Sequence, residues 1–244
     1  MSERPYTVLS CAMSLDGCLD DGSGERLILS NASDLDRVDA VRAACDAILV
    51  GAGTVRADKP RLLVRSEVRR KRRRALGLAP SPCKVTVTRG GMGLDPTSAF
   101  FTTGECDKLV YCASEKVADA RDRLDGVAVV IDAGLQPSMA VVSEDLVRRG
   151  VRQLLVEGGQ SVHTQFLGED LADELHVVVA PFFVSSSRAH RIVAEGPLPW
   201  NPSRRAHLAE VRQIGDVVLM RYALSERFAP HALADAELTM AQGG

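Results

Sequence analysis

The sequence predicts an α/β fold with three layers, in which a mostly parallel central sheet lies between helices. Short apolar, β-branched runs alternate with segments of helical periodicity along most of the chain, which is the pattern of strands joined by crossover helices. Runs such as Ala47–Val50 and Gln153–Val156 are mostly apolar rather than alternating, as expected for strands covered on both faces. Near the end of the chain, only Gly215-Asp216 separates Leu208–Ile214 from Val217–Leu224, so we expect an antiparallel hairpin at one edge of the sheet.

The N-terminal elements follow from local patterns. Tyr6–Met13 is rich in β-formers and predicts the first buried strand, with a turn at Ser14–Gly17. Ser33 and Asp34 offer N-cap chemistry for a helix that extends to about Cys45. The apolar stripe of this helix is formed by Leu35, Val38, Val41 and Cys45.

Strands and helices are expected to alternate through the rest of the chain. The expected strands are Lys84–Thr88, Lys108–Cys112, Val127–Ile131 and Glu174–Ala180, and the expected helices are Ser114–Leu124, Ala140–Arg149 and an amphipathic segment that ends at Leu167. No linker or repeat divides the chain, so we expect a single domain over residues 1–224. Residues 225–244 lack periodicity and predict a flexible tail.

The composition is that of an ordinary globular protein, with 244 residues, 45% hydrophobic and 25% charged. A net charge of −2 provides no field that would attract nucleic acid or a membrane surface. No apolar stretch approaches the roughly 20 residues of a membrane helix, and no signal peptide is evident, so we expect a cytoplasmic protein. The six cysteines form no Cys-x-x-Cys pair, and His163 and His176 have no partner at metal-ligand spacing. We therefore expect free thiols, ordinary histidines and no metal site.

The basic run Arg69–Arg74 is the one feature that points toward nucleic acid. It holds six consecutive cations, but no aromatic residue is interleaved with them. Because the whole chain is slightly acidic, we interpret the run as a solvated, mobile loop rather than a binding surface.

Two glycine-rich turns join expected strands to helical segments. One is Gly51-Ala52-Gly53-Thr54, and the other is Glu157-Gly158-Gly159. A helix N-terminus offers free N–H groups and partial positive charge, which suit a phosphate, so two such junctions suggest a nucleotide with two phosphate-bearing ends. Neither turn is a Rossmann fingerprint or a Walker A loop, because Arg56 stands where the fingerprint needs glycine and no Gly-Lys-Ser/Thr follows. Each turn by itself is also common without any ligand.

Four charged side chains near these turns have the chemistry of ligand contacts. Glu157 follows the end of a strand, where open α/β sheets bind ligands. Asp58 could hold a ribose hydroxyl or an amine, and Arg42 and Arg65 could bind a phosphate through the guanidinium fork. Taken singly, Glu157 could equally form a salt bridge, Asp58 could be a turn residue, and either arginine could be a solvated or ion-paired side chain.

Taken together, these segments resemble the reductase domain of bacterial riboflavin biosynthesis, the RibD C-terminal domain family, which has a dihydrofolate-reductase-like fold. The matching segments are Ala12–Gly17, Arg42–Arg65, Leu155–Gly159, Leu171–Leu175 and Ala180-Pro181. Their order and spacing agree over roughly residues 5–224. A conjunction of this length is far more specific than any one of its motifs.

The resemblance implies an NADPH-dependent reductase that converts a ribosylaminopyrimidine 5′-phosphate to its ribitylamino form, with hydride transfer to sugar C1′ of an open-chain imine. It implies NADPH contacts at Ala12, Thr54, Asp58, Gly159, Gln160, Ser161, Val162, His163, Thr164 and Gln165, and we expect the backbone of Gly51, Gly53 and Gly158 to approach the pyrophosphate. It implies substrate contacts at Arg42, Leu62, Arg65 and Glu157. Asp58 and Glu157 are the candidates for a catalytic proton donor, as is a bound water. The family analogy also predicts a homodimer.

Some segments differ from the family pattern. Leu27–Ser30 lacks the tryptophan that family members often carry before the serine, and Ser33-Asp34-Leu35 replaces a Ser-Arg pair. Phe182–Ser187 lacks the glycine pair usual after the proline, so we expect a loop of different shape. The His-x-Glu and Pro-Cys-x-x-Cys motifs of the deaminase domain are absent, so we expect a stand-alone reductase.

These departures leave two alternatives open. The first is a related reductase of another pterin or pyrimidine, such as dihydrofolate or a secondary-metabolite precursor. The second is a non-catalytic nucleotide- or RNA-binding protein that kept the fold and uses the basic run at 69–74.

Overall fold

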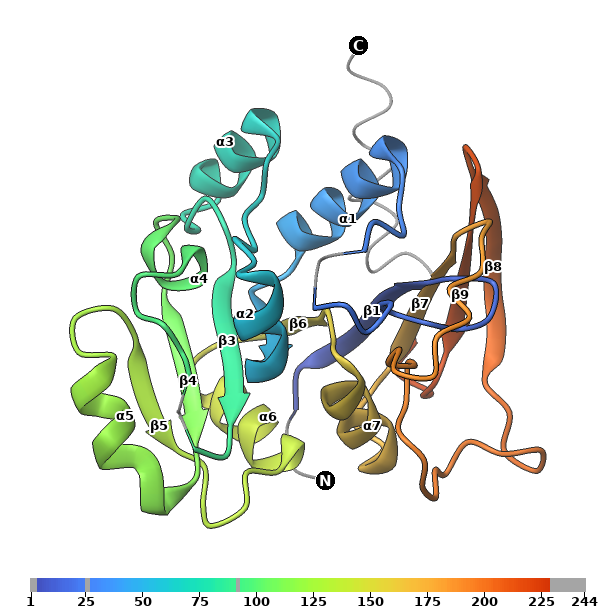
Figure 1. Ribbon diagram of the computed structural model, residues 1–244. Helices are drawn as coiled ribbons and strands as arrows, with labels where there is room; N and C mark the ends of the chain where they lie inside the picture. The colour runs from blue at the N-terminus through green and yellow to red at the C-terminus, as the bar shows by residue number, and fades with distance from the viewer. Residues whose placement is uncertain (1–3, 25–26, 91–92, 229–244) are drawn as a thin grey trace.

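The computed structural model describes residues 4–24, 27–90 and 93–228, so most of the predicted tail, residues 229–244, lies outside the described residues. Within these ranges a nine-stranded sheet forms the middle of the molecule (Figure 1). The strands are β1 (Tyr6–Met13), β2 (Ala47–Gly51), β3 (Cys83–Thr88), β4 (Lys108–Cys112), β5 (Val129–Asp132), β6 (Gln153–Val156), β7 (Glu174–Val179), β8 (His207–Ile214) and β9 (Val217–Ala223). The helices are α1 (Ala32–Ala44), α2 (Ala52–Asp58), α3 (Glu67–Ala75), α4 (Ala99–Thr102), the 3₁₀-helix η1 (Ser114–Lys116), α5 (Val117–Arg123), α6 (Met139–Arg148) and α7 (Gln160–Gly168).

The strand order is β5-β4-β3-β2-β6-β1-β7-β9-β8. The first seven strands of this spatial order, from β5 at one edge to β7, pair in parallel. Strand β9 is antiparallel to both β7 and β8, which confirms the predicted hairpin at the sheet edge. The chain moves from β2 outward to β5 and then returns to place β6 between β2 and β1. This reversal brings the carboxyl ends of β2, β6 and β1 side by side, which is where open α/β sheets bind ligands.

Apolar clusters cover both faces of the sheet and confirm the three-layer prediction. Leu154 and Leu155 are consecutive in β6, and both are fully buried. Leu154 packs in a cluster with residues of α6 and α7, and Leu155 packs in a cluster with residues of α4 and α5. Because successive side chains of a strand point to opposite faces, one apolar run supplies both cores. None of the helices in the described part of the chain is both long enough and apolar enough to span a bilayer.

Helix α1 begins earlier and buries different residues than its sequence pattern predicts. Its N-cap is Asn31, whose side-chain oxygen accepts a hydrogen bond from the backbone N–H of Asp34 at 2.9 Å. Ser33 and Asp34 therefore lie within the helix, and the predicted cap is wrong. The buried side of α1 carries the charged residues Asp34, Arg37 and Asp39. Each has an oppositely charged partner, because Asp34 pairs with Arg37 on the same helix and Asp39 pairs with Arg69 of α3.

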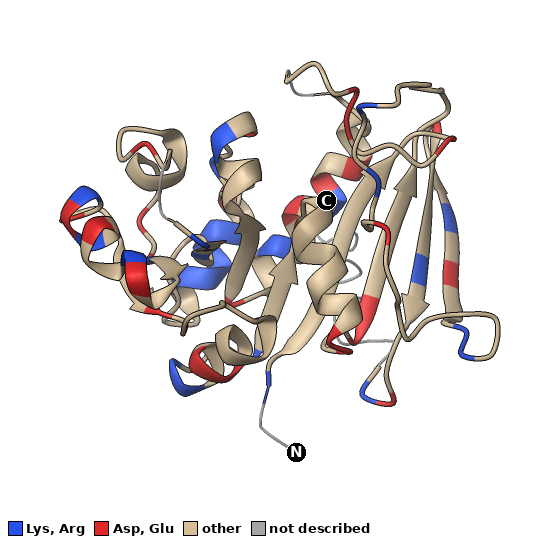
Figure 2. Cartoon of the chain, turned by 60° about the horizontal axis from the view of Figure 1, so that its bottom comes forward, with Lys and Arg blue, Asp and Glu red and all other residues tan. Residues whose placement is uncertain are grey.

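The prediction of a mobile loop at 69–74 is also wrong, because this segment lies within helix α3. Arg69 forms ion pairs with Asp36 and Asp39 of α1 at 2.6 and 2.9 Å. Arg69 and Arg73 are four residues apart on one face of α3 and both are buried. Figure 2 shows charges of both signs distributed over the helices and the edge strands. Arg69 of the basic run therefore attaches α3 to α1.

We expect Arg73→Met to lower the free energy of unfolding by about 2 kcal/mol, because it leaves one buried and two partly buried carbonyl oxygens without a donor. The Arg73 guanidinium donates to the carbonyls of Ala43, Cys45 and Ala79 at 2.8 to 2.9 Å, and methionine keeps only the apolar stem. Urea denaturation measures the loss. The matched control is Arg72→Met, at an exposed position of the same helix, which should change stability by less than about 0.5 kcal/mol. Equal, small losses in both variants would contradict this account of α3.

Candidate active site

A cleft opens at the carboxyl ends of β1, β2 and β6, and it has two connected halves. The glycine half lies along Gly51, Gly53 and Gly158-Gly159 and has a volume of about 480 Å³. The α1 half lies between helix α1 and the segment Leu27–Ser30 and has a volume of about 390 Å³. Both volumes are in the range of small-molecule sites. The residues that line both halves are Cys11, Ala12, Leu27 and Glu157.

The wall of the glycine half depends on close backbone approach between two turns. The Gly51 N–H donates to the Gly158 carbonyl at 2.9 Å, which joins the end of β2 to the turn after β6. A Cβ at Gly51 would lie 3.0 Å from the Val162 side chain, and a Cβ at Gly159 would lie 3.1 Å from the hydroxyl of Thr54. Gly158 has a φ of +105°, which L side chains rarely adopt. The two glycine turns identified in the sequence therefore form one continuous surface.

Helix α7 points its N-terminus into this surface. Its N-cap is Gly159, which provides no side-chain cap, so the first backbone N–H groups of the helix have no side-chain acceptor at this end. The partial positive charge of a helix N-terminus and these N–H groups suit an anionic ligand such as a phosphate. The Thr54 hydroxyl lies 3.4 Å from the Gly159 N–H and ties α2 to the same turn. A ligand with a pyrophosphate fits the chemistry of this cradle.

Most residues predicted to contact a cofactor line the glycine half. These residues are Ala12, Gly51, Gly53, Thr54, Asp58, Gly158, Gly159, Gln160, Ser161, Val162 and His163. The last two of the predicted run, Thr164 and Gln165, are not among the lining residues. The Thr164 hydroxyl accepts a hydrogen bond from the Ala194 N–H at 2.8 Å, and the Gln165 amide donates to Ser161 at 3.2 Å. The structure thus gives these two side chains contacts within the protein.

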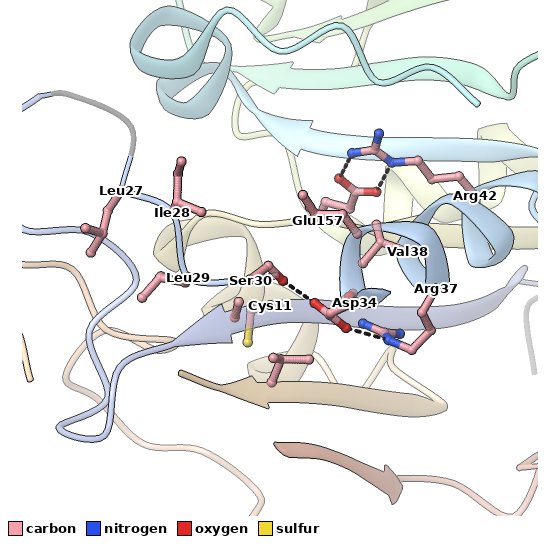
Figure 3. Close-up of a pocket in the computed structure, with 14 residues that line it drawn as sticks. Cys11, Leu27, Ile28, Leu29, Ser30, Asp34, Arg37, Val38, Arg42 and Glu157 are labelled. Atoms are coloured by element: carbon pink, nitrogen blue, oxygen red, sulfur yellow. Dashed lines mark hydrogen bonds and ion pairs between the residues drawn. The ribbon is translucent and has the colours of Figure 1, made fainter. Parts of the chain in front are cut away.

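An ion pair between Arg42 and Glu157 stands where the two halves meet (Figure 3). The Nε and one terminal nitrogen of Arg42 each donate to one oxygen of Glu157, both at 2.6 Å. This bidentate geometry requires an ionised carboxylate and fixes the orientation of both side chains. Burial by itself would lower the pKa of Arg42, but the Glu157 charge outweighs it and the pKa is raised. For Glu157 the sequence analysis gave a salt bridge as the alternative to a ligand contact. That salt bridge is present, and it lies in the wall of the cleft.

A second polar group in the α1 half consists of Ser30, Asp34 and Arg37, which Figure 3 shows in a row. The Ser30 hydroxyl donates a short hydrogen bond to one oxygen of Asp34. The other oxygen of Asp34 accepts from Arg37 Nε at 2.7 Å. Apolar side chains surround this row within the cleft, among them Leu35 and Val38, which the sequence analysis placed on the apolar stripe of this helix. The α1 half is therefore an apolar pocket with a few fixed polar groups.

Buried charges behind the α1 half support this row. Arg37 contacts His176 Nδ1 at 3.4 Å, and His176 Nε2 contacts Glu174 at 2.8 Å. Glu174 also accepts from Arg221 Nε at 2.7 Å. Burial lowers the pKa of His176, although the Glu174 carboxylate acts in the opposite direction. Burial would raise the pKa of Glu174, but His176 and Arg221 outweigh it and the pKa is lowered.

Two predicted substrate contacts, Leu62 and Arg65, lie outside the cleft wall. Leu62 is buried in the core with a φ of +48°, and Arg65 is half exposed and donates to the Leu35 carbonyl through one terminal nitrogen. Neither lines the cleft. Asp58 does line the glycine half and is exposed at the end of α2. The assignment of these residues to a ligand remains a prediction.

The sequence reasoning missed several residues that line the cleft. Asp20 and His190 line the glycine half and contact each other at 2.7 Å, although they lie in distant loops that no local pattern connects. Asp34 and Arg37 carried a partial signal, because charged residues three apart on a helix can pair, but the sequence did not indicate that this pair is buried. Among the described residues no group of three His, Cys, Asp or Glu side chains is placed to hold a metal ion.

Comparison with known proteins identifies the family of the chain. A family model described as the RibD C-terminal domain matches residues 5–220. A protein of Archaeoglobus fulgidus named 2,5-diamino-6-ribosylamino-4(3H)-pyrimidinone 5′-phosphate reductase is 33% identical over 229 residues, which cover 92% of this chain and 99% of that protein. A protein of the same name from Methanothermobacter thermautotrophicus is 30% identical, covering 91% of this chain and 99% of that protein.

The fold also matches solved structures. A pyrimidine reductase-like protein from Corynebacterium diphtheriae superposes with a TM-score of 0.73 at 24% identity, with 90% of this chain and 91% of that chain covered. At this identity the likeness concerns the fold, and it agrees with the mixed sheet and the antiparallel edge described above.

Proposed function

The chain belongs to the RibD C-terminal domain family, and we propose that it is an NADPH-dependent reductase of riboflavin biosynthesis that converts a ribosylaminopyrimidine 5′-phosphate to its ribitylamino form. The observation that carries the proposal is the two-part cleft. The glycine half has the backbone and helix N-terminus that suit a pyrophosphate. The α1 half is a smaller pocket with a few fixed polar groups. The archaeal relatives, named for a reductase of this kind and matched over nearly their whole length, support the same function.

The residues of the chain act mainly by positioning the two ligands. Gly51, Gly53 and the N-terminus of α7 would hold the diphosphate of NADPH, which when bound supplies the hydride for C1′ of the sugar. The residues that line both halves, Cys11, Ala12, Leu27 and Glu157, would bring the two ligands against each other at the junction of the halves.

The proton that completes the reduction needs a separate source. Glu157 accepts hydrogen bonds from Arg42 through both oxygens, an arrangement of the ionised carboxylate, so we assign it to positioning. We propose that the imine nitrogen takes this proton from a water molecule in the cleft. Asp58 lies exposed on the glycine half, and the effect of Asp58→Asn on NADPH affinity and on turnover separates a cofactor contact from a proton-transfer role.

The direct test is a titration followed by a turnover assay. NADPH and NADH are titrated by fluorescence, and NADPH oxidation is then followed with 2,5-diamino-6-ribosylamino-4(3H)-pyrimidinone 5′-phosphate, dihydrofolate and other pterins. We expect NADPH to bind and the ribosylaminopyrimidine phosphate to be reduced. Absence of NADPH binding would contradict any reductase function, and turnover of only a pterin would show that the substrate is a different one.

We expect Thr54→Ala to weaken NADPH binding by about 5- to 10-fold, because the loss of one hydrogen bond is worth about 1 kcal/mol. The Thr54 hydroxyl lies against the Gly159 N–H at the mouth of the cradle. Thr54→Ser keeps the hydroxyl and is the matched control, which should bind NADPH almost as well as the unmodified protein. Equal affinities in the alanine and serine variants would exclude this hydroxyl from the cofactor site.

We also propose a homodimer. Leu208 and Val211 of β8 are 47% and 58% exposed, and Val218 of β9 is 37% exposed. Apolar side chains gathered on an edge hairpin favour burial against another surface. Analytical ultracentrifugation tests the proposal, and a purely monomeric species at micromolar concentration would contradict it.

A further inference from the structure

His190 lies in the chain between β7 and β8, and the loop after β1 holds it at the glycine half of the cleft. Its backbone N–H donates to Asp20 Oδ1 at 3.1 Å, and its carbonyl accepts from the Leu19 N–H at 2.7 Å. All three residues line the glycine half. Because main-chain contacts hold His190 in place, its side chain is not needed to keep the two loops together.

The imidazole of His190 has one nitrogen in use and one available. Nδ1 lies 2.7 Å from Asp20 Oδ2, and an ionised carboxylate can only accept, so Nδ1 carries a proton. Nε2 meets no partner within residues 4–24, 27–90 and 93–228, and the side chain is 62% exposed. A carboxylate on one ring nitrogen fixes the orientation of the ring and leaves the other nitrogen for a ligand.

The glycine half is poor in positive charge. Among the described residues no lysine or arginine lines it, whereas the carboxylates of Asp20, Asp58 and Glu157 do. The N-terminus of α7 supplies roughly half an elementary charge. His163 also lines this half, but it is fully buried, and burial lowers its pKa to about 4, so it stays neutral. Within the described chain, His190 is therefore the lining side chain that can bring a full positive charge to an anionic ligand.

The segment after His190 lies along the first turns of α7. The Val193 carbonyl accepts from the side-chain amide of Gln160 at 3.2 Å, and the Ala194 N–H donates to the Thr164 hydroxyl at 2.8 Å. These contacts attach the His190 loop to the end of α7 whose backbone N–H groups suit an anion. The helix N-terminus and the imidazole thus belong to the same region of the glycine half.

We infer that His190 binds the diphosphate of the nicotinamide cofactor together with the N-terminus of α7, and that Asp20 positions its ring. This inference rests on the proposed function and deepens it by naming the side chain that gives the diphosphate a counter-charge. A phosphate oxygen next to Nε2 favours the protonated imidazole, which donates a charge-assisted hydrogen bond to it. A hydrogen bond of this kind corresponds to about 10- to 100-fold in affinity.

Calorimetric titration of His190→Gln with four ligands tests the inference. NADPH, NADH and ADP-ribose share the diphosphate, whereas adenosine 2′-phosphate has the adenosine and no diphosphate. Glutamine stays polar but carries no charge, so we expect the first three ligands to bind about 10-fold or more weakly, all by a similar factor. The affinity for adenosine 2′-phosphate should not change. His207→Gln is the matched control, because His207 is exposed on β8 and lies outside the cleft lining, and it should leave all four affinities unchanged.

Asp20→Asn tests the positioning role. The asparagine oxygen can still accept from the His190 backbone N–H, but the neutral amide no longer supports a charge on the ring. We expect the three diphosphate ligands to bind about 3- to 10-fold more weakly, and we expect no further loss when Asp20→Asn is added to His190→Gln. A merely structural role of Asp20 would add its own loss in the double variant, and that result would contradict the positioning role.

Three results would overturn the assignment of His190 to the diphosphate. The first is unchanged affinity for ADP-ribose in folded His190→Gln, with folding checked by thermal melting. The second is a loss confined to NADPH, which would place the contact at the 2′-phosphate. The third is an equal loss for adenosine 2′-phosphate, which would place it at the adenosine.

Failure of the proposed function has a different signature. In that case the unmodified protein would not bind NADPH, or would bind it without reducing the ribosylaminopyrimidine phosphate. Binding and turnover in the unmodified protein, together with unchanged affinities in His190→Gln, would overturn the inference alone.

Discussion

Glu157→Gln is expected to lower kcat/KM for the ribosylaminopyrimidine phosphate by about 100-fold, the size of effect that a misplacement of about 1 Å in an active site can produce. A neutral amide has one oxygen, so it cannot accept both hydrogen bonds that Arg42 donates at 2.6 Å. The guanidinium would then lose its fixed orientation at the junction of the two halves of the cleft. Steady-state assays at saturating NADPH measure the loss.

Glu144→Gln is the matched control for this variant. Glu144 forms an exposed ion pair with Arg148 on helix α6 at 3.3 Å, and exposed pairs of this kind contribute little to stability. Its activity should equal that of the unmodified protein. Full activity in Glu157→Gln would show that the Arg42 pair plays no part in holding the ligands, and that the cleft wall tolerates its loss.

His163 is expected to make folding stability sensitive to acid. The side chain is fully buried in α7, and burial lowers its pKa from 6.5 to about 4. Between these values the unfolded chain binds a proton that the folded protein does not, so the free energy of unfolding falls as the pH falls. The stabilisation that comes from keeping His163 neutral is fully present above pH 6.5. The free energy of unfolding falls by about 2 kcal/mol by pH 5 and by about 3 kcal/mol by pH 4 as this stabilisation is lost.

The variant His163→Leu isolates this contribution. Urea denaturation of both proteins at pH 7 and pH 5 gives two differences in unfolding free energy. We expect the unmodified protein to lose about 2 kcal/mol more than the variant over this interval, because all other titrating groups are common to both. Identical pH dependence in the two proteins would mean that His163 is not held neutral in the fold.

The order of the elements could be read from the sequence because the signals were local. β1 and β4 were predicted with their observed bounds, Tyr6–Met13 and Lys108–Cys112, since strands buried on both faces need continuous apolar runs. The edge hairpin was predicted from Gly215-Asp216 between two strands. Helix α4 was missed because its four residues are too few to show a helical period.

The two wrong predictions have one physical cause. Helix α3 depends on partners that lie far away along the chain, and Asn31, which caps α1, also donates to the Ile214 carbonyl and to Asp216 of the edge hairpin. Arg69 and Arg73 are buried because α1 supplies carboxylates and carbonyl groups to them. A sequence pattern shows only that a residue is charged, and a run of cations without visible partners is normally solvated.

The candidate site was predictable only in part. The glycine turns were recognised because few other residues allow backbones to approach so closely, and the structure shows the contacts that a Cβ would violate at Gly51 and Gly159. The pairing of Arg42 with Glu157 was one of the alternatives in the sequence. Asp20 and His190 carried no local signal and were missed.

The sequence by itself determined the α/β class, the two glycine turns at strand ends and the family, because these depend on local propensity, backbone sterics and the spacing of motifs along the chain. The tertiary structure alone decided that the turns form one wall and that Glu157 is held by Arg42. It also decided that Ser30, Asp34 and Arg37 stand in a row inside the cleft. The physical reason is that the direction and partner of a charged side chain are fixed by groups brought near it in folding, and the return of β6 between β2 and β1 is what brings them together.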